Sequence, residues 1–223
     1  KDVSFTVNPG ESVALVGPTG AGKSTIVNLI SRFYNVNDGK VLIDDQDIAD
    51  VTIHSLRAQM GIMMQDSFIF SGTIADNIRY GKLDATQEEI EKAGKIVCAD
   101  PFIREMPKGY ETQVRESGSM LSQGQKQLIS FARTLLCDPA ILILDEATSS
   151  IDVQTEKALQ TGLNRMLKGR TSFIIAHRLS TIRGCDKIMY IDDGGIAEAG
   201  THEELMKKKG RYYKLYTAQK SLH

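Results

Sequence analysis

Hydrophobic residues along the chain change their spacing several times, and each change marks a boundary between predicted elements. Short apolar runs predict strands at residues 12–16, 41–43, 141–144, 172–176 and 187–191. Apolar residues three and four apart predict helices at residues 23–33, 86–99, 122–136 and 153–167, with short helices after residues 101 and 178. Strands that alternate with helices indicate an α/β fold built on a mostly parallel sheet.

Three local signals refine this pattern. Apolar residues at positions 3, 5 and 7 alternate with polar ones and predict a further half-buried strand before a turn at residues 8–11. The Asp-Pro pair at residues 100–101 predicts a helix start, because aspartate caps helices and proline fits their first turn. Three tyrosines between residues 212 and 216 predict the packing face of a terminal helix.

A helical block between about residues 65 and 137 interrupts the alternation of strands and helices. We interpret this block as an inserted helical subdomain, with residues 1–64 and 138–223 forming the core. The sequence contains no internal repeat, low-complexity tract or linker.

The composition of the 223 residues is that of a globular protein, with 41% hydrophobic and 25% charged residues. The net charge of −1 provides no electrostatic footprint for bulk nucleic acid or for an anionic membrane. The longest apolar run has five residues, at positions 140–144, whereas a membrane-spanning helix needs about 20. We therefore expect no segment of this sequence to cross a bilayer.

Cys98, Cys137 and Cys185 lie far apart in the sequence and form no CxxC pair. This usage favours free thiols in a reducing compartment over structural disulfides or a zinc site. The sequence shows no signal peptide, and it begins at Lys1, without methionine and close to a predicted strand. We interpret it as part of a longer chain.

A glycine-rich segment joins the predicted strand at residues 12–16 to the predicted helix at residue 23. It matches the phosphate-binding pattern G-x-x-x-x-G-K-[ST] in full. Its glycines allow backbone N–H groups to face a phosphate at the positive end of the helix dipole. Lys23 would reach the β- and γ-phosphates, and Ser24 would ligate Mg²⁺. The predicted nucleotide site comprises Gly17, Pro18, Thr19, Gly20, Ala21, Gly22, Lys23, Ser24 and Thr25.

Two carboxylates, Asp145 and Glu146, end the predicted strand at residues 141–144. Parallel α/β sheets bind ligands beyond the carboxyl ends of their strands, so we expect both side chains beside the phosphates. Asp145 is expected to complete the Mg²⁺ shell, mostly through water, and Glu146 to polarise an attacking water. The phosphate-binding segment by itself would also fit kinases and GTPases.

Between these two motifs lies the sequence Leu-Ser-Gln-Gly-Gln, at residues 121–125. Together the three segments resemble the nucleotide-binding domain of ATP-binding cassette (ABC) transporters, over essentially the whole chain. Residues 121–125 resemble the LSGGQ signature of that family, with Gln123 in place of its first glycine. Gln65 resembles the Q-loop glutamine, Ser149-Ser150-Ile151-Asp152 the D-loop, and His177 the switch histidine.

The resemblance implies a P-loop NTPase (RecA-like) core with a mostly parallel sheet, a small antiparallel β part and an inserted α-helical subdomain. It implies ATP and Mg²⁺ as ligands, with Gln65 as a further Mg²⁺ contact and His177 as a sensor of the γ-phosphate. It also implies a head-to-tail dimer in which one domain completes the ATP site of the other through Ser122, Gly124, Gln125 and Asp152.

Two segments resemble exporters rather than importers within the family. They are residues 65–78 and residues 112–118, where Arg115 replaces the usual glycine. The resemblance thus implies ATP hydrolysis, with Glu146 as base, that powers export across a membrane. The implied partners are a second nucleotide-binding domain, identical or different, and a transmembrane domain, with no nucleic acid. The implied location is the cytoplasmic side of a membrane.

Two other functions remain open at this point. A soluble ABC-type ATPase that acts on nucleic acid or ribosomes would share the catalytic motifs, but would usually carry tandem domains, a coiled-coil insert or basic arms. A nucleotide-gated structural module would bind ATP without hydrolysis, although Glu146 and His177 favour hydrolysis. The adenine-stacking aromatic residue of the family is expected before Lys1, so a longer chain should bind ATP more tightly.

Overall fold

The computed structural model describes residues 2–146 and 151–221, so Ser149 and Ser150 of the predicted D-loop lie outside the described residues. The described chain divides into two compact units. Residues 2–60, 140–146 and 170–221 form the first unit, and residues 61–139 and 151–169 form the second. The second unit therefore includes residues 151–169, which the sequence analysis assigned to the core.

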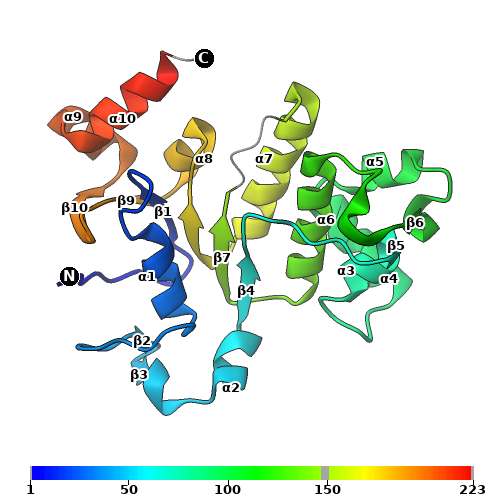
Figure 1. Ribbon diagram of the computed structural model, residues 1–223, viewed down its shortest axis with the longest axis horizontal. Helices are drawn as coiled ribbons and strands as arrows, with labels where there is room; N and C mark the ends of the chain where they lie inside the picture. The colour runs from blue at the N-terminus through cyan, green and yellow to red at the C-terminus, as the bar shows by residue number, and fades with distance from the viewer. Residues whose placement is uncertain (1, 147–150, 222–223) are drawn as a thin grey trace. The chain divides into compact units, whose positions relative to one another are not determined.

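The first unit is built on a sheet in which five strands follow the order β10-β9-β1-β8-β7 (Figure 1). These strands are β1 (Ser12–Val16), β7 (Ile141–Asp145), β8 (Thr171–Ile175), β9 (Lys187–Asp192) and β10 (Gly195–Gly200). β9, β1, β8 and β7 are parallel to one another, and β10 pairs antiparallel with β9. Every residue of β1 is buried, as expected for a central parallel strand with both faces covered. The predicted mostly parallel α/β sheet is confirmed.

Helices and a short hairpin complete the first unit. The hairpin of β2 (Leu42–Ile43) and β3 (Gln46–Asp47) is antiparallel, which confirms the predicted small antiparallel part. The helices are α1 (Lys23–Ile30), the 3₁₀ helix η1 (Ile48–Asp50), α2 (Ile53–Ala58), α8 (Leu179–Gly184), α9 (His202–Lys208) and α10 (Arg211–Lys220). Tyr212 of α10 is fully buried, as the tyrosine pattern predicted, and its hydroxyl lies 2.8 Å from Nδ1 of His202.

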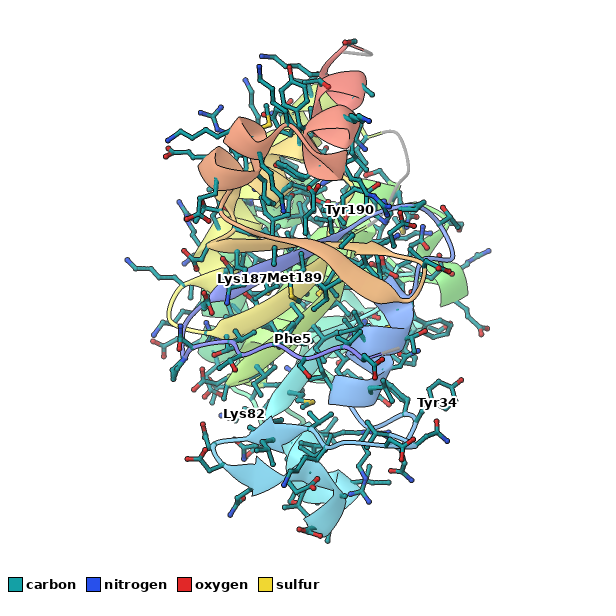
Figure 2. All side chains as sticks on the ribbon, turned by 90° about the vertical axis from the view of Figure 1, so that its left-hand side faces the viewer. Phe5, Tyr34, Lys82, Lys187, Met189 and Tyr190 are labelled. Atoms are coloured by element: carbon teal, nitrogen blue, oxygen red, sulfur yellow. The ribbon has the colours of Figure 1, made fainter. Side chains whose placement is uncertain are left out.

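The N-terminal segment of the first unit differs from its predicted structure. Residues 3–7, all described, form no strand. The carbonyl of Thr6 accepts a hydrogen bond from the side chain of Lys187 (2.9 Å) rather than from the backbone of a neighbouring strand. Figure 2 marks Phe5 on this segment and Lys187 on β9. The alternation of apolar residues reflects a contact of Phe5 with the ring of Phe173, not a sheet ladder.

Two further differences in the first unit come from residues with positive φ. The helix predicted at residues 23–33 ends at Ile30, and Arg32 just beyond it has φ 55°, a left-handed conformation that cannot continue a helix. Strand β10 was not predicted. Asp193 and Gly194 before it both have positive φ and form the tight turn of its hairpin with β9, so the Asp-Gly pair was a usable signal.

The second unit is mainly helical and gathers around α6 (Gln123–Leu136), whose apolar face is buried. α6 packs against α3 (Ile74–Arg79), α4 (Gln87–Ile96) and α7 (Val153–Leu167). The other elements are β4 (Met60–Met63), β5 (Gly72–Thr73), β6 (Gln113–Val114), α5 (Asp100–Glu105), and the 3₁₀ helices η2 (Gly109–Glu111) and η3 (Glu116–Gly118). The first residue of β4, Met60, is assigned to the first unit. α7 has the predicted bounds, and Asp152 caps its first turn.

The predicted cap of α5 is wrong. Asp100 is the first residue of the helix, and the residue before it, Ala99, makes no side-chain capping bond. The Asp100 carboxylate accepts hydrogen bonds from Arg104 Nε (2.9 Å) and from the hydroxyl of Tyr110 (2.8 Å). A tertiary partner has therefore replaced the local cap, while Pro101 lies in the first turn as predicted.

The thiols agree with the sequence analysis. Cys98, Cys137 and Cys185 are all free, and burial raises the pKa of Cys185 to about 12. No helix formed by the described residues is both long and apolar enough to span a membrane.

Candidate active site

The loop between β1 and α1 has a backbone that glycine makes possible. Gly17 has φ 139°, and a Cβ placed on it would lie 2.1 Å from the carbonyl oxygen of Ile191 in β9. Gly22, with φ 107°, is the N-cap residue of α1 and supplies no capping side chain. The first N–H groups of α1 are therefore not capped by the residue before them, which is the arrangement that binds a phosphate.

Lys23 folds back into this loop. Its Nζ donates hydrogen bonds to the carbonyls of Gly17 and Pro18, each at 2.8 Å, and its side chain is buried. Desolvation lowers the pKa of Lys23, and the charge of Asp145 opposes that shift. The loop thus holds a partly desolvated cation among neutral acceptors. Ser24 and Thr25 in the next positions are exposed.

Strands β7 and β8 bring two further predicted residues together. They pair in parallel, with Asp145 opposite Ile175, so Asp145 and His177 emerge at the same edge of the sheet. His177 Nε2 lies 3.9 Å from Asp145 Oδ1. Desolvation raises the pKa of Asp145, while His177 and Lys23 act in the opposite direction. A carboxylate, an imidazole and a lysine ammonium are therefore electrostatically coupled at this edge.

Glu146 is the most enclosed member of the site, with only 5% of its surface exposed. Its Oε2 accepts hydrogen bonds from the backbone N–H groups of His177 (2.8 Å) and Arg178 (2.9 Å). Its Oε1 accepts a bond of 2.6 Å from the hydroxyl of Thr181. The carboxylate that sequence reasoning assigned to the attacking water is thus held by residues just before α8 and within it.

The start of α6, in the second unit, is built differently from the start of α1. Ser122 Oγ accepts a hydrogen bond from the Gln125 N–H (3.1 Å), and Gln125 Oε1 accepts one from the Ser122 N–H (3.0 Å). This is a complete capping box. Gly124 is buried, and a Cβ on it would lie 2.3 Å from Cγ2 of Thr155 in α7. Glycine at position 124 therefore favours close packing of α6 against the side chain of Thr155 within the unit.

Comparison with known proteins now decides the family. A sequence model described as "ABC transporter" matches residues 1–149, two thirds of the chain. The chain belongs to the ABC transporter family. The match includes the P-loop, the signature and both carboxylates, Asp145 and Glu146.

Relatives named as ABC transporter proteins are similar over nearly the whole chain. The uncharacterized ABC transporter ATP-binding protein YfiC of Bacillus subtilis is 55% identical over 219 residues, which are 98% of this chain and 36% of the relative. The fatty acid ABC transporter ATP-binding/permease protein of Mycobacterium bovis is 49% identical over 218 residues, 98% of this chain and 34% of the relative. A solved bacterial Atm1-family ABC exporter with ATP bound matches with a TM-score of 0.90 and 46% identity, over 97% of this chain and 38% of that one.

The chain spans about a third of the length of these relatives. The predicted ABC family and the predicted P-loop fold are confirmed by these comparisons, and the solved relative is described as an exporter.

The residues predicted for ABC chemistry divide between the two units. The P-loop residues, Asp145, Glu146 and His177 lie in the first unit. Gln65, Ser122, Gly124, Gln125 and Asp152 lie in the second. Gln65 is exposed beyond the end of β4, and Asp152 Oδ1 accepts a hydrogen bond from the Thr155 N–H (2.9 Å), which lowers its pKa.

The two departures from the family pattern are compatible with the backbone. Arg115 has φ −87° and ψ 163°, an extended conformation that any residue adopts. Gln123 is the first residue of α6 and lies next to Ser122, whose cap is intact. Neither position needs the conformational freedom of glycine in this structure.

Sequence reasoning missed Arg178 and Thr181. Arg178 Nη1 lies 3.9 Å from Glu146 Oε1, and the Thr181 hydroxyl contacts the same oxygen. Their position just after His177 was a weak signal. It became meaningful only when the fold brought Glu146 to this segment, more than thirty positions away in the chain.

Proposed function

We propose that this chain binds ATP on its P-loop and hydrolyses it, with Glu146 accepting a proton from the attacking water. The observation that carries the proposal is the convergence of Lys23, Asp145 and His177 in one unit, at the carboxyl edge of a parallel sheet. Ligands bind at that edge in open α/β sheets. Ionisable groups that influence one another's charge at such a position are candidates for a functional site.

Lys23 and the start of α1 would bind the phosphates. The Lys23 ammonium now donates to two neutral carbonyls, and exchange of these for phosphate oxygens would create stronger, charge-assisted hydrogen bonds. The negative charge of the phosphates would also offset the desolvation that lowers the pKa of Lys23. His177, 3.9 Å from Asp145, would hold its ring toward the γ-phosphate.

The donor chemistry of the first unit fits Mg²⁺. Ser24 offers an exposed hydroxyl in the first turn of α1, and Asp145 offers a carboxylate at the end of β7. Both are oxygen donors, which Mg²⁺ prefers, and phosphate oxygens, water and Gln65 would complete the shell. When bound, Mg²⁺ would neutralise charge that develops on the phosphate oxygens.

We propose that the second unit acts on a second nucleotide-binding domain. The capping box uses the N–H groups of Ser122 and Gln125, and the Ser122 hydroxyl hydrogen stays available because its oxygen is the acceptor. This hydroxyl and the backbone of α6 near Gly124 would contact the γ-phosphate held by the partner, with Asp152 nearby in the dimer. The solved relative, described as an ABC exporter with ATP bound, supports ATP as the nucleotide.

We also propose that the chain is the nucleotide-binding part of a membrane exporter and works on the cytoplasmic side. The support is that relatives are named ATP-binding/permease proteins and are about three times as long as this chain. The second unit, residues 61–139 and 151–169, would contain the helical subdomain that the sequence analysis placed at residues 65–137. Its segment at residues 65–80 and the loop around Arg115 would transmit the conformational change to the transmembrane domain.

The test is ATP turnover by Glu146→Gln in the full-length protein, followed by phosphate release. We expect turnover to fall by about 10²- to 10⁴-fold, with ATP binding retained, because the amide cannot accept the proton. Glu203→Gln, the same chemical change at an exposed residue of α9, should leave turnover unchanged. Turnover that survives in Glu146→Gln would remove Glu146 from the mechanism.

The dimer is tested by light scattering on Glu146→Gln with and without Mg-ATP. The protein measured is the isolated domain. We expect its mass to double only when Mg-ATP is present. An isolated domain that binds ATP but stays monomeric would contradict association between identical copies of this chain. Wild-type protein that binds ATP without releasing phosphate would instead favour a nucleotide-gated module.

A further inference from the structure

The carboxylate of Glu146 is almost saturated by donors from one short segment. Three hydrogen bonds reach it from His177 N–H, Arg178 N–H and the Thr181 hydroxyl, and the guanidinium of Arg178 lies 3.9 Å away. An ionised carboxylate has about four lone-pair positions, and three are filled here. A general base needs an open position for the water that it deprotonates, and the fourth position of Glu146 belongs to a residue that is only 5% exposed.

We propose that Thr181 is a positioning residue that holds Glu146 in a withdrawn, resting position, from which the carboxylate must be released before it can act on water. The proposal rests on the proposed role of Glu146 as base. In this proposal, Thr181 restrains ATP hydrolysis until the His177 segment shifts.

The geometry at Thr181 supports a restraint rather than incidental packing. Its side chain is 3% exposed, and its hydroxyl lies 2.6 Å from Glu146 Oε1, the distance of a strong bond between a hydroxyl and a carboxylate. Glu146 itself is 5% exposed, so water competes little for either partner. The side chain of Thr181 is therefore the one member of the three hydrogen-bond donors that a substitution can remove without altering the backbone.

The remaining two donors link the withdrawal of Glu146 to the switch histidine. They are consecutive backbone N–H groups, at His177 and Arg178, and both bind Glu146 Oε2. If the carboxylate left alone, both groups would lose an acceptor in a part-buried setting, which is unfavourable. Release of Glu146 is therefore expected to accompany a shift of the His177 segment, as when His177 engages a phosphate.

The experiment compares two substitutions of Thr181 in the full-length protein. Thr181→Val keeps the shape of the side chain and removes the hydroxyl, whereas Thr181→Ser keeps the hydroxyl. Loss of a bond to a charged acceptor should raise basal kcat of Thr181→Val about threefold to tenfold, with KM for ATP within about twofold of wild type. Thr181→Ser should return kcat to near the wild-type value.

Matched controls separate this effect from a loss of packing. Thr217→Val removes a hydroxyl that bonds the Tyr213 carbonyl within α10, and should leave kcat unchanged. If Thr181→Val does not fold, Thr181→Ala also removes the hydroxyl without adding bulk and should show the same rise. A fall in kcat, or no change in a folded variant lacking the hydroxyl, would overturn the proposal.

A second background distinguishes failure of this inference from failure of the proposed function. In Glu146→Gln, the Thr181→Val substitution should produce no rise, because the restrained base is gone. If Glu146→Gln alone leaves turnover intact, the role of Glu146 as base fails. A third outcome is that Glu146→Gln abolishes turnover and that Thr181→Val, with Glu146 present, lowers kcat. Glu146 would then remain the base, and Thr181 would support its working position instead of restraining it.

Discussion

The N-termini of α1 and α6 are both predicted to contact phosphate, yet one lacks a side-chain cap and the other has one. α1 follows Gly22, which has no side chain to cap the helix, and its first residue is the buried Lys23. α6 follows Ser122, which forms a reciprocal capping box with Gln125. The first N–H groups of α1 have no capping side chain and are open to a ligand, whereas two N–H groups at the start of α6 are paired with side chains of Ser122 and Gln125.

This difference shows how much each helix start depends on ATP. The open start of α1 has a positive end and a buried ammonium that only neutral carbonyls contact, so a phosphate improves its interactions. The start of α6 is capped by its own side chains, and only the groups outside the capping box, such as the Ser122 hydroxyl hydrogen and the backbone near Gly124, remain for a phosphate. We therefore expect strong phosphate binding at the P-loop, and a weaker contact at the signature that depends on a second domain.

The largest expected effect is a loss of stability when Gly17 receives a side chain. Gly17→Val would place Cβ 2.1 Å from the Ile191 carbonyl oxygen at φ 139°, and we expect it to destabilise the fold by about 3–5 kcal/mol. Gly20→Ala is the control, because its φ is also positive (78°) but its Cβ would meet nothing within 4 Å. We expect about 1 kcal/mol for Gly20→Ala in denaturant unfolding. Equal losses would show that conformational strain, not the contact with β9, restricts the loop.

The next effect concerns the open start of α1 itself. Lys23→Met should weaken ATP binding by about 100-fold, or about 2.7 kcal/mol, because the charge-assisted bonds to phosphate are lost. The stability of the empty protein should not fall, since desolvation of the Lys23 ammonium disappears with it. Isothermal titration with a non-hydrolysable ATP analogue measures the affinity, and thermal unfolding measures the stability. Loss of stability without loss of affinity would show that Lys23 is a structural residue.

At the closed start, Gly124→Ala is expected to be less severe than Gly17→Val. Its added Cβ would meet the Cγ2 methyl of Thr155 at 2.3 Å, a side-chain atom that can move, so we expect a loss of about 1–3 kcal/mol. Thr155→Ser removes that methyl group and should recover most of the loss in the double variant. A double-mutant cycle by denaturant unfolding measures the coupling. If the two losses simply add, the contact between α6 and α7 does not explain the glycine.

The smallest effect is the loss of the cap on α6. Ser122→Ala should lower the free energy of unfolding by about 1 kcal/mol, since one bond of the capping box is lost. Ser122→Thr preserves the hydroxyl and should restore stability. Wild-type stability in Ser122→Ala would mean that the box contributes nothing, and the contrast with α1 would lose its energetic basis.

Some parts of this protein could be predicted from the sequence because their causes are local. α7 has its predicted bounds because its apolar spacing and the Asp152 cap are contained within the helix. The capping box of α6 also has a local cause, because Ser122 and Gln125 are three positions apart. The P-loop was predictable because its glycines, Lys23 and the preceding strand are contiguous. The same contiguity makes the ABC motifs recognisable.

Other parts depended on residues that are distant in the chain. Asp100 accepts a bond from Tyr110 instead of capping α5, and the segment at residues 3–7 meets Lys187 and Phe173 rather than a paired strand. The reason for glycine at position 124 is Thr155, on another helix. A hydrogen bond or close contact of this kind leaves no periodic trace in the sequence.

The family and the parallel α/β sheet follow from short contiguous patterns in the chain, and the same patterns predict the site residues. What those residues contact depends on how the chain folds in three dimensions. Glu146 follows Asp145 directly, yet one side chain lies near His177 Nε2 and the other is bound by the backbone of His177 and by Thr181. Side-chain partners are fixed by packing between elements that are distant in the chain, so the order of residues could identify the carboxylate but not its hydrogen-bond partners.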